Sequence, residues 1–171
     1  MYIESEDHLD RSADEVYPLV RDEMPRLLPY MPDVEALEQL SYERESETRV
    51  RIVNRWQAKA SVPSLVEKFL PKDMFTWIDR AYWKDDEYCV DYVLEGFGYT
   101  AKGTNYFTPD GGGTKLRVTA EITIDPSKFK IPKLLFNKAF PMIEGSVRKA
   151  VQPNLTALAR GLRDYFAAQG K

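Results

Sequence analysis

Cysteine and histidine are almost absent from this 171-residue chain, which contains one residue of each. Cys89 has no partner for an internal disulfide, which argues against a secreted scaffold held by disulfides. His8 and Cys89 have no ligand spacing around them, and two histidines for a two-histidine-one-carboxylate iron site are lacking. We therefore expect no metal site and no cofactor, and no nucleophilic catalysis that depends on a histidine.

Long apolar runs and dense basic stripes are also missing. No apolar run approaches the roughly 20 residues that span a bilayer, and residues 1–7 lack the basic and apolar regions of a signal peptide. We therefore expect a cytoplasmic protein. Without a Lys/Arg stripe, a zinc pattern or a helix-turn-helix pattern, nucleic acid is not an expected partner. The glycine run 111–113 lies between two expected strands, so it predicts a hairpin and not a phosphate-binding loop.

The overall composition is that of an ordinary globular protein, with 43% apolar and 30% charged residues. The length fits a single domain, residues 1–171, whose core needs no disulfide or metal. The charge is uneven: residues 1–48 carry 14 acidic and 4 basic side chains, and residues 49–171 carry 13 and 20. Either the two parts attract each other within one fold, or the surface is polarised toward a partner or a membrane.

Alternating apolar and polar residues predict seven strands. The expected ranges are 2–9, 34–40, 48–60, 74–83, 88–94, 99–108 and 114–124. The strands from 34 onward follow one another with short links, which favours an antiparallel meander. The capping-box pattern Ser12–Glu15 predicts the start of a short helix, and a second short helix is expected near Leu27.

The C-terminal part changes to a helical period. Apolar residues recur at steps of three and four from Phe136 to Phe166, which predicts an amphipathic helix of up to about 30 residues covering the sheet. We place Pro141 in its first turn, where proline is tolerated, and expect Pro153 to kink it.

This order of elements, together with the segment from His8 to Asp22, resembles the START-like, or Bet v 1-like (SRPBCC), superfamily. Trp77-Ile78-Asp79 and the segment Gly103–Phe107 are similar to it as well. The resemblance implies an α+β helix-grip fold: a curved antiparallel sheet of about seven strands, two short helices and a long C-terminal helix. Such proteins usually hold a hydrophobic ligand between sheet and helix. They include lipid-transfer proteins, hormone receptors, and polyketide cyclases and aromatases, so the fold alone does not fix the function.

Large rings on the strands and apolar residues of the helix are our candidates for lining such a cavity, although each can equally belong to a plain core. The set is Trp56, Trp77, Trp83, Tyr92, Tyr106, Phe107, Phe140, Ile143 and Val147.

Two polar residues, Asn54 and Asp79, are each expected on the apolar side of their own strand. Asn54 needs a hydrogen-bond partner, which is either a neighbouring strand or water, or a ligand that it anchors. Asp79 lies on the side of Trp77, where burial would raise its pKa and suit it to acid–base work. Alternatively, Asp79 ends a strand in solvent or pairs with an arginine.

Two connecting segments combine lysine with large apolar residues and suggest transient contact with an anionic membrane. Their key residues are Phe69 and Leu70 in one and Lys130 and Lys133 in the other. The alternative is that the segments pack on each other.

Three functions remain open. The favoured one is non-enzymatic binding, and transport, of a lipid, sterol, isoprenoid or polyketide-like molecule, because no catalytic constellation is evident. The second is an enzyme of the cyclase, aromatase or dehydratase kind that uses Asp79 as a base. The third is a protein-interaction or regulatory domain with a filled interior. The oligomeric state is not indicated.

Overall fold

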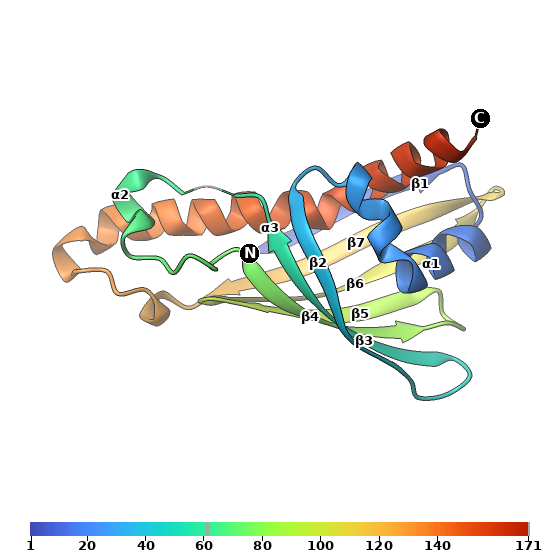
Figure 1. Ribbon diagram of the computed structural model, residues 1–171, viewed down its shortest axis with the longest axis horizontal. Coiled ribbons are helices and arrows are strands. Elements are labelled where there is room, and N and C mark those ends of the chain that lie inside the picture. Colours follow the sequence, from blue (N-terminus) through green and yellow to red (C-terminus); the bar gives the residue numbers. More distant parts are fainter. Residues whose placement is uncertain (61, 171) are drawn as a thin grey trace.

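A seven-stranded antiparallel sheet curves around one long helix in the computed structural model of the chain (Figure 1). The structure describes residues 1–60 and 62–170, with the side chains of 154–156 excepted. The elements in chain order are β1 (Tyr2–Leu9), α1 (Ala13–Asp22), η1 (Met24–Tyr30), β2 (Val34–Arg44), β3 (Arg49–Ala58), α2 (Ser64–Glu67), β4 (Thr76–Lys84), β5 (Cys89–Gly96), β6 (Tyr99–Asp110), β7 (Gly113–Ile124), η2 (Pro126–Lys128) and α3 (Lys133–Gln169).

The strand order is β1-β7-β6-β5-β4-β3-β2, and every neighbouring pair is antiparallel. Strands β2 to β7 form the expected meander, and β1 joins its far edge by pairing with β7. Alternation along β7 turns Leu116, Val118, Ala120 and Ile122 into the core, as the sequence predicts. The α+β helix-grip arrangement is confirmed.

Helix α1 begins where the capping box predicts it. The Glu15 carboxylate accepts a hydrogen bond from the Ser12 backbone N–H at 3.2 Å. The buried face of α1, with Val16 and Val20, lies against the inner side of the sheet. The 3₁₀ helix η1 follows as the second short helix.

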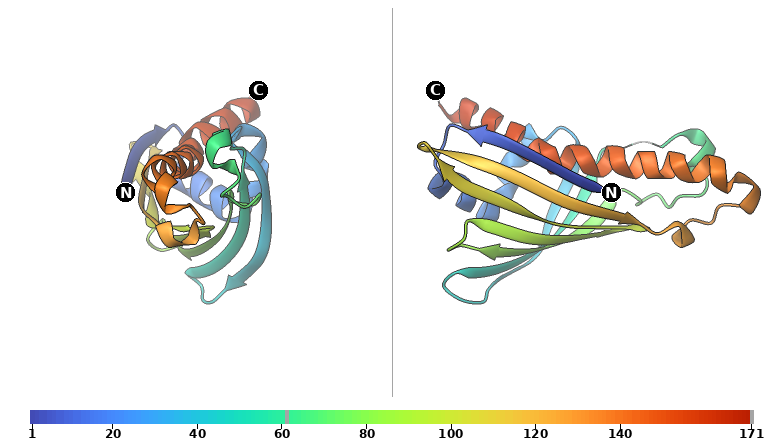
Figure 2. Two further views of the ribbon diagram at one scale, coloured as in Figure 1. Left: turned by 90° about the vertical axis from the view of Figure 1, so that its left-hand side faces the viewer. Right: turned by 180° about the vertical axis from the view of Figure 1, so that it is seen from behind.

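Helix α3 begins earlier than expected, at Lys133, so Pro141 lies inside it and not in its first turn. Ring contacts hold these extra turns: Phe136 stacks on Phe140 with centroids 5.1 Å apart, and Phe129 contacts Phe140 at 6.3 Å. Toward its C-terminus the helix leaves its initial direction (Figures 1 and 2), as expected for a helix with Pro153 in its interior.

The two ends of the molecule differ. One end holds α1 and the β4–β5 turn, and the other holds α2, η2 and the start of α3 (Figure 2). Among the helices that the structure describes, none is both long and apolar enough to cross a membrane.

Candidate functional site

A cavity of about 100 Å³ lies between the inner face of the sheet and the helices α1, η1 and α3. All three tryptophans of the chain line it. An apolar cavity of about 150 Å³ is enough to take up benzene, so this somewhat smaller space suits a small molecule or one part of a larger one. The lining residues are Val20, Met24, Met31, Trp56, Trp77, Asp79, Ala81, Trp83, Val90, Tyr92, Leu94, Asn105, Val151 and Leu158.

Strand β4 supplies much of the cavity floor. Its alternation turns Trp77, Asp79, Ala81 and Trp83 to the same face, where the small Ala81 leaves room between the larger side chains. Trp56 of β3 lies opposite Trp77 in the register. The tryptophans therefore occupy cavity positions because of strand parity.

Asp79 is the acidic residue of this floor. Its Oδ2 accepts a hydrogen bond from Trp56 Nε1 at 3.2 Å, and its Oδ1 has no partner among the described residues. The carboxyl group lies deep in the protein, and the residue as a whole is half-buried and lines the cavity. Burial raises the pKa of Asp79 to about 7, against a small opposing effect of the Trp56 hydrogen bond.

Two more cavity residues carry buried polar atoms without a partner in the described part of the chain, Trp83 Nε1 and Asn105 Oδ1. Asn105 was missed in the sequence analysis. It lies two residues before Phe107 on β6, so strand parity gives it the same face and was the signal that could have found it.

Tyr92 lines the cavity with its ring, while its hydroxyl is already engaged. The hydroxyl donates a hydrogen bond to the Thr119 carbonyl at 2.6 Å, and burial raises the pKa of Tyr92. The side chain passes close to Gly103, where a Cβ would lie 1.8 Å from the Thr119 oxygen and 2.8 Å from the Tyr92 hydroxyl. The absence of a side chain at Gly103 therefore leaves room for the hydrogen bond between Tyr92 and Thr119.

The prediction for Tyr106 was wrong. Adjacent residues of a strand point to opposite faces, so Tyr106 and Phe107 cannot both face the cavity. Tyr106 is exposed on the outer face with the Arg117 guanidinium 5.8 Å from its ring centre. Phe107 points inward but lies in the core, where it contacts Tyr17 at 5.4 Å and Trp83 at 6.3 Å and does not line the cavity.

The helix residues and Asn54 were also placed differently from the prediction. Ile143 and Val147 are fully buried in the core, and α3 lines the cavity further along, with Val151 and Leu158. Phe140 packs between the rings of Phe129 and Phe136. Asn54 lies opposite Asp79 in the register but is half-buried and outside the lining.

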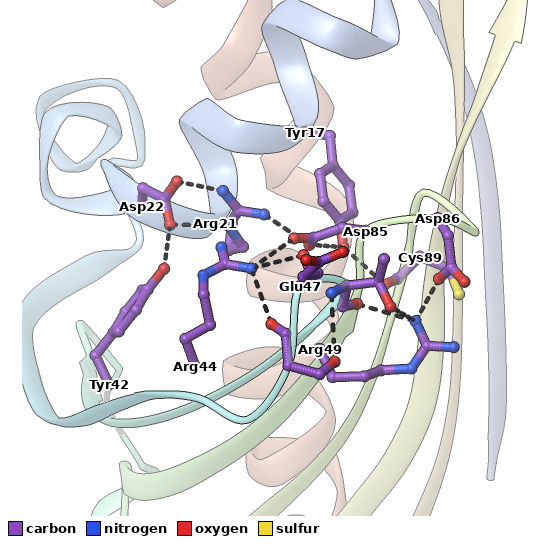
Figure 3. Close-up of polar contacts among 12 residues, drawn as sticks. Tyr17, Arg21, Asp22, Tyr42, Arg44, Glu47, Arg49, Asp85, Asp86 and Cys89 are labelled. Carbon is purple, nitrogen blue, oxygen red and sulfur yellow. Dashed lines mark hydrogen bonds and ion pairs between the residues drawn. The ribbon is translucent and has the colours of Figure 1, made fainter.

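A polar cluster joins α1 to the β4–β5 turn at one end of the molecule (Figure 3). Arg21 forms ion pairs of 2.6 Å with both Asp85 and Asp22, Arg44 lies 3.2 Å from Asp85, and the Tyr17 hydroxyl lies 3.1 Å from Asp85. Burial by itself would raise the pKa of Asp85, but the hydrogen bonds from Arg21 and Arg44 outweigh it and lower the pKa. Because its groups satisfy one another, we interpret the cluster as structural.

The two lysine-containing segments lie at the opposite end. Lys130 and Lys133 are exposed, whereas Phe69 and Leu70 are half-buried and pack against the core. Leu134, which is 99% exposed, is the prominent apolar residue there. No cluster of three or more His, Cys, Asp or Glu side chains that suits a metal ion occurs within the described ranges.

Comparison with solved structures identifies the fold. A protein from Thermus thermophilus is 25% identical and superposes over 100% of both chains with a TM-score of 0.69. The Zhui aromatase/cyclase from a Streptomyces species is 16% identical, with 96% of this chain and 93% of that chain covered and a TM-score of 0.64. Norcoclaurine synthase from Thalictrum flavum is 15% identical, with coverages of 100% and 96% and a TM-score of 0.59. No protein-family model and no curated protein sequence matches the chain. The chain has the START-like, Bet v 1-like helix-grip fold.

Proposed function

We propose that this helix-grip protein binds a compact, mainly apolar molecule in the cavity beneath α3. The observation that carries the proposal is the cavity itself, with all three tryptophans in its wall. Burial of apolar ligand surface would stabilise the complex by roughly 25 cal/mol per Å². Structural neighbours include an aromatase/cyclase and norcoclaurine synthase, which supports a small-molecule site in this fold.

The cavity volume narrows the ligand classes expected from the sequence. About 100 Å³ is below the roughly 150 Å³ that takes up benzene, so a single ring needs a small expansion of the cavity, whereas a whole sterol, isoprenoid, lipid or polyketide would require α3 to move away from the sheet. We therefore infer that the enclosed part of the ligand is one ring or a short branched group. Transport of such a ligand within the cytoplasm remains part of the proposal.

Tryptophan fluorescence tests the proposal directly, because every tryptophan of the chain lies in the cavity wall. Single-ring compounds should change the emission, and native mass spectrometry should detect the complex. The variant Ala81→Leu fills the floor and should abolish both signals, while Val93→Leu on the exposed face of β5 should leave them unchanged. Equal binding by the wild type and Ala81→Leu would contradict the proposal.

Asp79 supports a second candidate function, an enzyme of the cyclase, aromatase or dehydratase kind. A carboxyl group with a pKa of about 7 can accept and return protons near neutral pH. In that case the wild type would convert a bound compound into a product, whereas Asp79→Asn would bind the same compound without converting it. Conversion at the same rate by Asp79→Asn would exclude this role.

The lysine-containing end supports a further proposal, transient contact with an anionic membrane. Leu134 and Leu135 are exposed at the start of α3, beside Lys130 and Lys133. A protein-interaction domain with a filled interior is less well supported, since the interior contains the cavity.

A further inference from the structure

Three residues that line the cavity each carry a buried polar atom without a hydrogen-bond partner among the described residues: Asp79 Oδ1, Trp83 Nε1 and Asn105 Oδ1. Buried polar atoms are nearly always hydrogen-bonded, because an unmade bond costs free energy that the fold must compensate elsewhere. The rest of the lining is mainly apolar. These three atoms are therefore the positions at which a bound molecule that reaches them gains hydrogen bonds that the described residues do not provide.

The strand register fixes how the three residues are distributed over the cavity floor. Asp79 and Trp83 are four residues apart on β4, about 13 Å between Cα atoms, with Ala81 between them. Trp83 lies opposite Val90 of β5, and Val90 lies opposite Asn105 of β6, so Trp83 and Asn105 share one row about 10 Å apart. The cavity thus has Trp83 and Asn105 toward one end and Asp79 toward the other.

Charge limits the ligand as well. No Lys, Arg or His is found among the described residues of the lining, and Asp79 is the one acidic residue there. A carboxylate or phosphate ligand would have no cationic partner in this space and would be repelled by an ionised Asp79. A fatty acid or another organic anion is therefore a poor match for the cavity.

Resting on the proposed binding function, we propose that the ligand is a neutral ring compound with a hydroxyl group, such as a phenol. A hydroxyl oxygen accepts a hydrogen bond from the indole N–H of Trp83, which can only donate, and the hydroxyl proton is donated to Asn105 Oδ1 at the same end of the cavity. A hydroxyl also suits Asn105 if its amide group is turned the other way, because it can both donate and accept. The tryptophan rings around the floor favour a flat apolar body.

Three probes of similar size separate the possibilities: p-xylene, p-cresol and 4-methylbenzoate. We expect p-cresol to bind about 10-fold or more tightly than p-xylene, since an analogue without the hydroxyl leaves the cavity's polar atoms unpaired. Binding of 4-methylbenzoate should be at least as weak as that of p-xylene. Titrations followed by the ¹H–¹⁵N signals of the three indole groups, assigned with Trp→Phe variants, measure these affinities.

The indole signal of Trp83 also reports the hydrogen bond. It should move downfield with p-cresol and less with p-xylene. In Asn105→Leu, and independently in Trp83→Phe, the preference for p-cresol should fall several-fold while p-xylene still binds. Asn137→Leu, at an exposed position of α3, is the matched control and should keep the preference.

The outcomes distinguish this inference from the function on which it rests. If p-xylene binds as tightly as p-cresol to the wild type, the polar atoms do not select the ligand, and the inference is overturned while the apolar cavity site stands. Preferred binding of 4-methylbenzoate would also overturn it. If none of the probes binds, both the inference and the proposed function fail.

Discussion

Asp79 illustrates how a single position on a strand can change the chemistry of a carboxyl group. Its place between Trp77 and Ala81 on the inner face of β4 removes it from water, and burial raises its pKa to about 7. The sequence suggested this through parity, but left open whether the residue would end a strand in solvent or pair with an arginine. The structure favours the buried alternative, since its hydrogen-bond partner is Trp56.

The pKa of Asp79 can be measured through its neighbour. Trp56 donates its indole N–H to Asp79, so the indole signal of Trp56 should titrate with a midpoint near pH 7. Tyr92 is the titratable group whose charge interacts with Asp79, and its own raised pKa keeps it neutral across this range. The titration should vanish in Asp79→Asn. A midpoint near pH 4 in the wild type would show that the carboxyl group is hydrated.

The same residue predicts a pH-dependent stability. Its pKa is higher in the folded protein, about 7, than the ordinary value of 3.8, so between these pH values the folded state keeps a proton that the unfolded state has lost. The contribution of Asp79 therefore becomes less favourable as pH rises from about 4 to 7 and then stays constant. The difference in unfolding free energy between Asp79→Asn and the wild type should therefore shift by about 2–3 kcal/mol in favour of the variant when the pH is raised from 5 to 8. Urea unfolding at the two pH values measures this, and an equal effect at both would contradict it.

Strands were better predicted than helices at the scale of elements, and the reason is geometric. A strand side chain has two directions, so parity alone placed the three tryptophans and Tyr92 in the cavity wall. The same alternation shows why the prediction for Tyr106 failed: Tyr106 is adjacent to Phe107 on β6, so the two side chains point to opposite faces of the sheet. On α3 the whole apolar face is buried, and only the three-dimensional fit decides that Val151 lines the cavity while Ile143 and Val147 fill the core.

The contact between α1 and the β4–β5 turn predicts a large mutational effect. Arg21 is held against Asp85 and Asp22, with its side chain only 12% exposed. Arg21→Met should lower the free energy of unfolding by about 2–4 kcal/mol, because it leaves Asp85 with one fewer cationic partner in a partly buried place. Arg80→Met removes an exposed pair with Glu95 and should cost less than about 1 kcal/mol. Similar effects of the two variants in urea unfolding would contradict the structural role of the cluster.

At the scale of the molecule, the uneven charge of the sequence is explained by internal pairing. Several acidic residues of the N-terminal part form ion pairs with basic residues from later elements: Glu4 with Arg117, Asp7 with Arg163, Asp33 with Arg160 and Glu38 with Arg55. The attraction of two parts of one fold accounts for these contacts. The order and direction of strands β2 to β7 could be predicted because consecutive strands tend to pair, and this held even for β3 and β4, whose link is long and contains α2. The cavity volume depends on packing that the sequence does not reveal.

Internal ion pairing does not explain the lysines at the end of the molecule that holds α2, η2 and the start of α3 (Figure 2). Leu134 and Leu135 are exposed there, and the sequence on either side of them carries four exposed lysines, Lys128, Lys130, Lys133 and Lys138. Apolar side chains can enter the headgroup region while lysines attract anionic lipid, each contributing about 1 kcal/mol near the surface. We therefore expect the protein to sediment with vesicles of phosphatidylcholine and phosphatidylglycerol, and less with phosphatidylcholine alone.

Salt and substitutions make the membrane prediction specific. Raising the ionic strength from 0.1 to 1 M shortens the Debye length from about 10 to 3 Å, so co-sedimentation should fall. Lys130→Gln with Lys133→Gln should weaken it, as should Leu134→Ser, and neither change should alter the unfolding free energy because these side chains are exposed. Lys102→Gln on the outer face of the sheet is the control and should sediment like the wild type. Equal sedimentation of the control and the Lys130/Lys133 variant would mean that this end of the molecule does not direct the contact.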